Sequence, residues 1–94
     1  MDLEKIIDLF LEGKIKAKEV SDMFYNGKLT LNNIKDKFEF SGLIQSLNKR
    51  YKEVNNEGVM LPYDISFQDT IITLMYAIEN KVKIDDLIGN YYEY

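Results

Sequence analysis

Apolar residues recur with helical spacing near the start of the chain. Positions i, i+3, i+4, i+7 and i+8 lie on one face of an α-helix, and here they are occupied by Leu3, Ile6, Ile7, Phe10 and Leu11. Asp2 is a suitable N-cap, and Gly13 can adopt the left-handed conformation that commonly ends a helix. The pattern therefore predicts a helix over residues 2–12.

Shorter stretches of the same periodicity predict further helices. They cover residues 17–25, 31–38, 42–54, 67–79 and 85–92. We expect Thr30 to be the N-cap of the helix over residues 31–38, with Phe38 in the core, and Ser41 to be the N-cap of the helix that follows. Together the patterns predict an all-α fold, a compact bundle of five to six short helices.

The clearest interruption is Asn-Asn-Glu-Gly at residues 55–58. Residues 59–65, which include the only proline, are predicted to be a loop or a short extended segment. Ser66 then begins a capping box, with Asp69 in place of the preferred Glu. The helix over residues 67–79 is apolar on most sides, which is typical of a central helix or a subunit interface. A homo-oligomer through this helix, with a small-ligand pocket between subunits, is one hypothesis.

One local pattern occurs three times, at residues 10–20, 24–34 and 77–87. Counted from Gly13, Gly27 and Asn80, apolar residues stand at −3, −2, +2, +4 and +7, and lysine stands at +1. Gly or Asn in the left-handed conformation ends one helix, and the apolar residue at +2 folds back onto it. The pattern predicts helix–turn–helix corners of the Gly/Asn-Lys kind and indicates no particular function.

The 94 residues are enough for a single helical domain over residues 1–94, and the 46% hydrophobic content is that of a chain with a core. No apolar run approaches the roughly 18–20 residues of a membrane span. The first residues lack the basic-then-apolar order of a signal peptide, so we expect a cytoplasmic protein.

The chain contains neither cysteine nor histidine. Thiolate chemistry, disulfides, the usual zinc ligands and a Ser-His-Asp triad are therefore excluded. The Gly-Lys pairs follow predicted helices and lack the rest of a phosphate-binding loop, and the adjacent acids lack a calcium-loop pattern. We expect no catalytic residues, no metal, no cofactor and no enzymatic activity.

Charge divides the chain unequally. Residues 1–52 carry ten Lys or Arg and eight Asp or Glu, whereas residues 53–94 carry two Lys and eight acids, so their balances are +2 and −6. Three tyrosines lie among the last four residues, and tyrosine is favoured at protein interfaces. The candidate partner-binding residues are therefore Asp64, Asp69, Asp85, Asp86, Tyr91, Tyr92, Glu93 and Tyr94.

These features favour a non-enzymatic protein-binding module. A small acidic helical protein can cover a basic surface of a partner by charge complementarity. Phage or mobile-element inhibitors, immunity proteins and antitoxins share this size and charge, and the comparison rests on those two properties alone.

The alternative is a transcription regulator that binds nucleic acid through a helix-turn-helix within residues 17–54. The chain's one basic cluster supplies the candidates. Asn48, Lys49 and Lys52 would contact phosphates, and Arg50, expected between the two lysines on the helix surface, would read a base edge. The acidic balance of the chain argues against this alternative.

Overall fold

The computed structural model describes residues 3–31, 37–56 and 66–84, where it contains five α-helices and no strand. The helices are α1 (Leu3–Leu11), α2 (Ala17–Tyr25), α3 (Lys37–Leu43), α4 (Gln45–Asn55) and α5 (Phe67–Asn80). The all-α prediction is confirmed. The expected helix over residues 85–92 and the expected extended segment at residues 59–65 lie outside the described residues.

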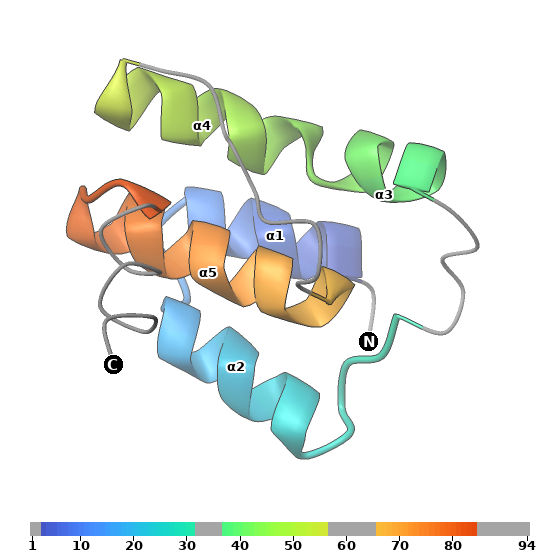
Figure 1. The fold of residues 1–94 in the computed structure, drawn as a ribbon. Helices are drawn as coiled ribbons and strands as arrows, with labels where there is room; N and C mark the ends of the chain where they lie inside the picture. Colours follow the sequence, from blue (N-terminus) through green and yellow to red (C-terminus); the bar gives the residue numbers. More distant parts are fainter. Residues whose placement is uncertain (1–2, 32–36, 57–65, 85–94) are drawn as a thin grey trace, which may run out of the picture.

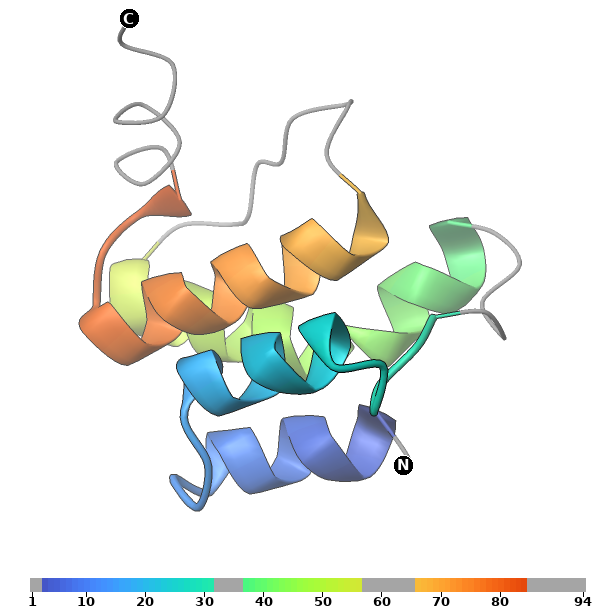
Figure 2. The same cartoon turned by 90° about the horizontal axis from the view of Figure 1, so that it is seen from below.

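The helices form three levels. In Figure 1, α3 and α4 run along one side, α1 and α5 occupy the middle, and α2 lies on the opposite side. Figure 2, seen from below, shows α2 lying across the space between α1 and α5. None of the five helices is long and apolar enough to cross a lipid bilayer.

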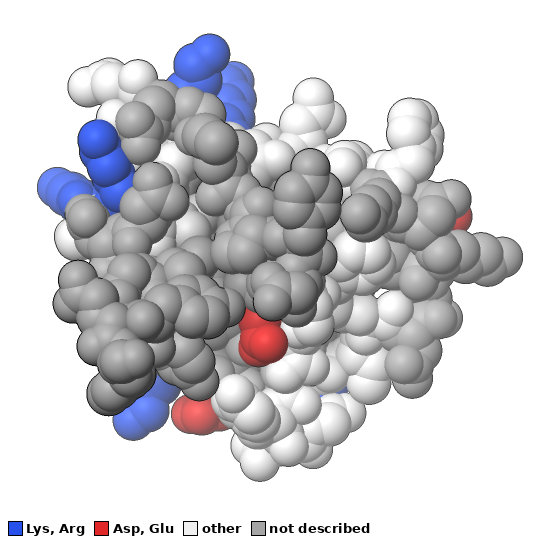
Figure 3. All heavy atoms as spheres, viewed as in Figure 1, with Lys and Arg blue, Asp and Glu red and all other residues white. Residues whose placement is uncertain are grey.

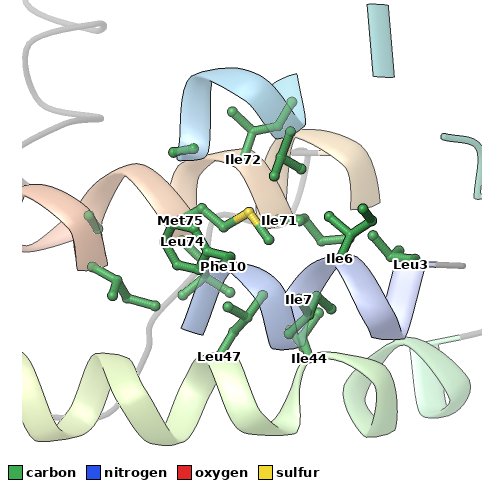
Figure 4. Packing of buried hydrophobic residues seen from close by; sticks show 14 of the residues in the cluster. Leu3, Ile6, Ile7, Phe10, Ile44, Leu47, Ile71, Ile72, Leu74 and Met75 are labelled. Carbon is green, nitrogen blue, oxygen red and sulfur yellow. The ribbon is translucent and has the colours of Figure 1, made fainter. Parts of the chain in front are cut away.

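The apolar helix α5 is the centre of the fold. It packs against α2 on one side and α4 on the other. Figure 4 shows Leu74 and Met75 of α5 meeting Phe10 of α1 above Leu47 of α4. Leu47, Leu74 and Met75 are fully buried, so burial within one chain accounts for the apolar character of α5. A homo-oligomer through residues 67–79 stays a prediction, and the apolar character of α5 no longer supports it.

The first two predicted corners have the expected geometry. Gly13 and Gly27 have φ angles of +79° and +77°, in the left-handed region that glycine adopts without strain. At the first corner the Gly13 N–H donates to the Phe10 carbonyl at 3.0 Å and the Lys14 N–H to the Leu9 carbonyl at 2.9 Å. This pair of bonds closes the helix as a Schellman motif.

The third corner lies one residue later than predicted. Asn80 remains helical, and its side-chain amide donates to the Tyr76 carbonyl at 2.9 Å. Lys81 takes the left-handed conformation instead, with φ of 56°, and its N–H donates to the Ile78 carbonyl at 3.3 Å. The Val82 N–H completes the motif by donating to the Ala77 carbonyl at 3.0 Å.

The boundary around α3 differs from the prediction. Leu31 is not helical, and most of the helix predicted over residues 31–38 lies outside the described residues. Within the described part α3 spans Lys37–Leu43, so Ser41 lies inside α3 rather than capping α4. Phe38, expected in the core, is 87% exposed, whereas Phe40 is 5% exposed. Residues two apart project to nearly opposite sides of a helix, so burial of Phe40 directs Phe38 outward.

Candidate functional site

One end of the bundle, called here the polar end (residues 11–19, 50–55 and 79–84), is joined by hydrogen bonds. The Ile84 N–H donates to the buried Tyr51 hydroxyl at 3.0 Å, and the Asn55 side-chain amide donates to the Val82 carbonyl at 3.2 Å. The Arg50 guanidinium reaches the Leu11 carbonyl at 3.5 Å. These bonds hold the C-terminal ends of α1, α4 and α5 together, on the left of Figure 1.

At this end, two glutamates accept hydrogen bonds from backbone N–H groups at the start of α2. The Ala17 N–H donates to Glu79 Oε1 at 3.3 Å, and the Lys16 N–H donates to Glu19 Oε2 at 3.2 Å. The first N–H groups of a helix have no partner within the helix and carry partial positive charge. Glu79, from the distant helix α5, therefore stabilises the start of α2.

The polar end is basic. It contains seven Lys or Arg and four Glu, and most of the Lys and Arg side chains visible in Figure 3 lie on this side of the view. Each glutamate has a contact: besides Glu19 and Glu79, Glu12 pairs with Lys14 at 3.1 Å and Glu53 pairs with Arg50 at 3.5 Å. The remaining excess of charge is positive.

The basic cluster proposed for nucleic acid does not form one face of α4. At about 3.6 residues per turn, Lys52 lies about 60° from Lys49 on one side and Arg50 about 100° on the other, so Arg50 does not lie between the two lysines. Its guanidinium contacts the Leu11 carbonyl of α1. Asn48 is half-buried, and its Oδ1 atom is buried without a hydrogen-bond partner. Lys49 and Lys52 are exposed. The four side chains are therefore spread around the helix.

The expected helix-turn-helix scaffold is also not formed by α3 and α4. Only Ile44 separates them, and Figure 1 shows them following one another along the same side of the molecule. A recognition pair requires a turn of about three to four residues and a crossing of roughly 90–120°. The connection between α2 and α3 includes residues 32–36, which lie outside the described residues.

The opposite end, called here the aromatic end (residues 24–31, 38–40 and 66–69), contains a groove of about 660 Å³. The end of α2, the turn after it and the first turn of α5 line this groove. Among the lining residues are Phe24, Tyr25, Leu29, Leu31, Phe67 and Asp69. A volume of this size is within the range of ligand-binding clefts.

Local structure positions both walls of this groove. On one side, the corner at Gly27 turns the chain back, and the Lys28 and Leu29 N–H groups both donate to the Met23 carbonyl, at 2.9 and 3.1 Å. Leu29 is thereby brought into the core, where it is 2% exposed. On the other side, the ring of Phe67 stacks on Phe40 of α3 with centroids 4.2 Å apart.

The start of α5 has the predicted N-cap. Ser66 Oγ accepts a hydrogen bond from the Asp69 N–H at 3.1 Å, and the Thr70 hydroxyl donates to the Ser66 carbonyl at 2.8 Å. The cap uses the backbone of Asp69 and leaves its carboxylate exposed, without an ion pair to any described residue. Asp69 therefore presents a negative charge at the edge of the groove.

Asp69 is the only predicted partner-binding residue within the described part of the chain. The other seven, Asp64, Asp85, Asp86, Tyr91, Tyr92, Glu93 and Tyr94, lie outside it. Sequence reasoning missed Tyr25, which lines the groove and is 74% exposed. Its exposure has no signal in the helical spacing: the buried residues of α2 are Ala17, Val20, Ser21 and Phe24, and Tyr25 continues that stripe at i+8.

A second, smaller groove of about 380 Å³ lies between α1 and the α3–α4 segment. Both signs of charge line it, with Glu4 and Asp8 on α1 facing Lys49 on α4. No group of three acidic side chains suited to holding a metal ion occurs among residues 3–31, 37–56 and 66–84.

The chain matches no protein-family model, no curated protein and no solved structure.

Proposed function

We propose that this protein is a non-enzymatic binding module, a small acidic inhibitor or regulator that covers a basic surface of a partner protein. The location of its negative charge carries the proposal. The described residues carry eleven Lys or Arg and nine Asp or Glu, a balance of +2. Residues 1–2, 32–36, 57–65 and 85–94 carry one Lys and seven acids, a balance of −6, which closes the chain's total of −4.

The net negative charge of the chain therefore comes from residues outside the described helices and turns. The ion pairs seen at the polar end involve Glu12 and Glu53, both within the described helices and corners. The surplus of carboxylates is thus a property of the sequence outside the described residues. A net negative charge accelerates encounter with a basic partner and disfavours nucleic acid.

The assignment as a binding module is supported by the poor chemical inventory of the chain. Without cysteine or histidine, covalent and acid–base catalysis near neutral pH would have to rely on carboxylates, lysines and hydroxyls alone. Its size and charge fit phage or mobile-element inhibitors, immunity proteins and antitoxins, and we place it in the cytoplasm. No cofactor or metal is part of the proposal.

The test is capture of partners from the native host with the tagged chain, with and without nuclease. A variant neutralises the predicted docking acids through Asp64→Asn, Asp69→Asn, Asp85→Asn, Asp86→Asn and Glu93→Gln. A matched control makes the same charge change elsewhere through Glu4→Gln, Asp8→Asn, Glu12→Gln, Asp22→Asn and Glu53→Gln. Circular dichroism establishes that both remain helical.

A protein retained after nuclease by the wild type and the control, and lost by the variant, is the expected result. Equal capture by variant and control would contradict the proposal, because capture would then depend on net charge alone or not on charge at all. Capture that disappears with nuclease would favour the alternative, a nucleic-acid-binding regulator.

The positive excess at the polar end is the observation in favour of that alternative. Lys52 and Lys81 are exposed there and have no ion pair with any described residue. Phosphate contacts by such lysines would give binding that weakens steeply with salt. A Lys52→Glu/Lys81→Glu variant should then lose a mobility shift that the wild type produces on host DNA or RNA.

A further inference from the structure

We infer that the groove at the aromatic end is the docking site, and that it receives a partner segment in which a large apolar side chain neighbours a Lys or Arg. This inference rests on the proposed function and names the surface that performs it. The smaller groove offers no comparable selectivity, because Glu4, Asp8 and Lys49 present both signs of charge to it.

Apolar side chains that are held by the fold form one part of the inferred binding site. Phe24 and Leu29 are 6% and 2% exposed, so they form the interior wall, and Phe67 and Leu31 are half-buried beside them. Burial of a partner's aromatic or long aliphatic side chain against the exposed parts of Phe67 and Leu31 removes apolar surface from water on both molecules. Tyr25, at 74% exposure, supplies further contact area.

The charged half comes from Asp69. Among the described residues that line the groove it is the only charged one, and none of them is Lys or Arg. Lys28 lies between two lining residues in the sequence without contributing to the lining itself. A cationic side chain is therefore attracted and an anionic one repelled. The Tyr25 ring can also receive a guanidinium or ammonium group on its face.

The walls are held in place before any partner arrives. The stack of Phe67 on Phe40 has an interplanar angle of 14°, and the Ser66 cap fixes the first turn of α5. Preformed walls reduce the entropy that binding must spend on ordering side chains. In its described part, the inferred site thus combines a fixed apolar wall, the exposed Tyr25 ring and the Asp69 carboxylate.

The experiment titrates N-acetyl-tryptophanyl-arginine amide into the ¹⁵N-labelled full chain and follows backbone amide shifts. N-acetyl-tryptophanyl-glutamate amide is the charge-reversed control probe. We expect the arginine probe to shift the amides of residues 24–31 and 66–69. We also expect the glutamate probe to bind at least about threefold more weakly, since exposed charge pairs change affinity by such factors.

Two pairs of variants test the residues. Asp69→Asn should weaken the arginine probe about two- to fivefold and leave the glutamate probe unweakened, whereas Asp8→Asn in the smaller groove should leave the arginine probe unchanged. Tyr25→Ser should weaken both probes about two- to tenfold, whereas Phe38→Ser, which removes an exposed ring that does not line the groove, should weaken neither.

Shifts elsewhere, no shifts, or equal effects of Asp69→Asn and Asp8→Asn would overturn the inference. Its failure is distinguishable from failure of the proposed function. If Asp69→Asn/Tyr25→Ser retains the captured partner while the five-residue acidic variant loses it, the function stands and the groove is not the docking site. If neither variant alters capture, the proposed function fails as well.

Discussion

The two ends of the helical bundle are closed by different kinds of contact. At the polar end, backbone groups left over at helix termini are satisfied by side chains, as in the bond from the Ile84 N–H to Tyr51 and the bond from the Ala17 N–H to Glu79. At the aromatic end, rings and aliphatic side chains make the contacts, and Phe40 stacks on Phe67.

The two ends therefore differ in which side-chain groups they expose to another molecule. Each glutamate of the polar end already has a hydrogen bond or an ion pair. The aromatic end leaves exposed the Tyr25 ring, the Phe38 ring and the Asp69 carboxylate, beside an open groove. The polar end therefore offers another molecule exposed lysines such as Lys52 and Lys81, whereas the aromatic end offers rings and a carboxylate beside a groove.

The largest expected effect is a loss of stability from a substitution at the aromatic end. Phe40→Ala removes a nearly buried ring and its stack on Phe67, and we expect it to lower the free energy of unfolding by about 3–5 kcal/mol. Phe38→Ala, two residues away and 87% exposed, should change it by less than about 0.5 kcal/mol. Urea denaturation followed by circular dichroism measures both. Similar losses for the two variants would show that the assignment of inward and outward rings is wrong.

The next effect concerns the polar end. Tyr51→Phe keeps the ring and removes the hydroxyl that accepts the buried Ile84 N–H, so it should cost about 1–3 kcal/mol. Amide hydrogen exchange of Ile84 should accelerate accordingly in the variant. An unchanged exchange rate would mean that this hydrogen bond does not hold residues 81–84 against α4.

The sequence predicts the features of these ends that depend on residues close together in the chain. It does not predict those that depend on contacts between distant segments. The helix predicted over residues 17–25 coincides with α2, and the one over residues 67–79 differs from α5 by a single residue, because a local apolar stripe and a local cap define each. The choice between Phe38 and Phe40 cannot be made locally. Both are apolar, and Phe67, far along the chain, decides which of them turns inward.

The candidate site was predictable only in part for the same reason. The place of Asp69 at the start of α5 follows from local capping chemistry, and its charge makes it a candidate from the sequence alone. The groove is formed by residues 24–31 and 66–69, segments that no periodicity connects. Its formation depends on the packing of α2 against α5. Tyr25 therefore appeared in the sequence only as one more apolar position of a corner.

A smaller effect is expected at the start of α5. Ser66→Ala removes the acceptor for the Asp69 N–H and should lower the free energy of unfolding by about 0.5–2 kcal/mol. Ser66→Asp, which retains an acceptor at the cap, should restore most of the loss. Chemical denaturation of the three proteins separates a capping role from a general effect of mutation at this position.

The smallest expected effects concern the left-handed residues that follow α5 and α2. Lys81 has a left-handed φ of 56°, which costs a non-glycine residue energy, so Lys81→Gly should be neutral to stabilising by up to about 1 kcal/mol. Gly27→Ala, at φ of +77° in open space, should destabilise by about 1 kcal/mol. Thermal melts should therefore place Gly27→Ala below the wild type and Lys81→Gly at or above it.

The most direct test sets the two ends against each other in one capture experiment. The wild type, the aromatic-end variant Asp69→Asn/Tyr25→Ser and the polar-end variant Lys52→Glu/Lys81→Glu are each used to retain nuclease-treated host proteins, quantified by mass spectrometry. We predict that the aromatic-end variant loses the partner and the polar-end variant retains it. Loss through the polar-end variant, with retention by the aromatic-end variant, would contradict the account.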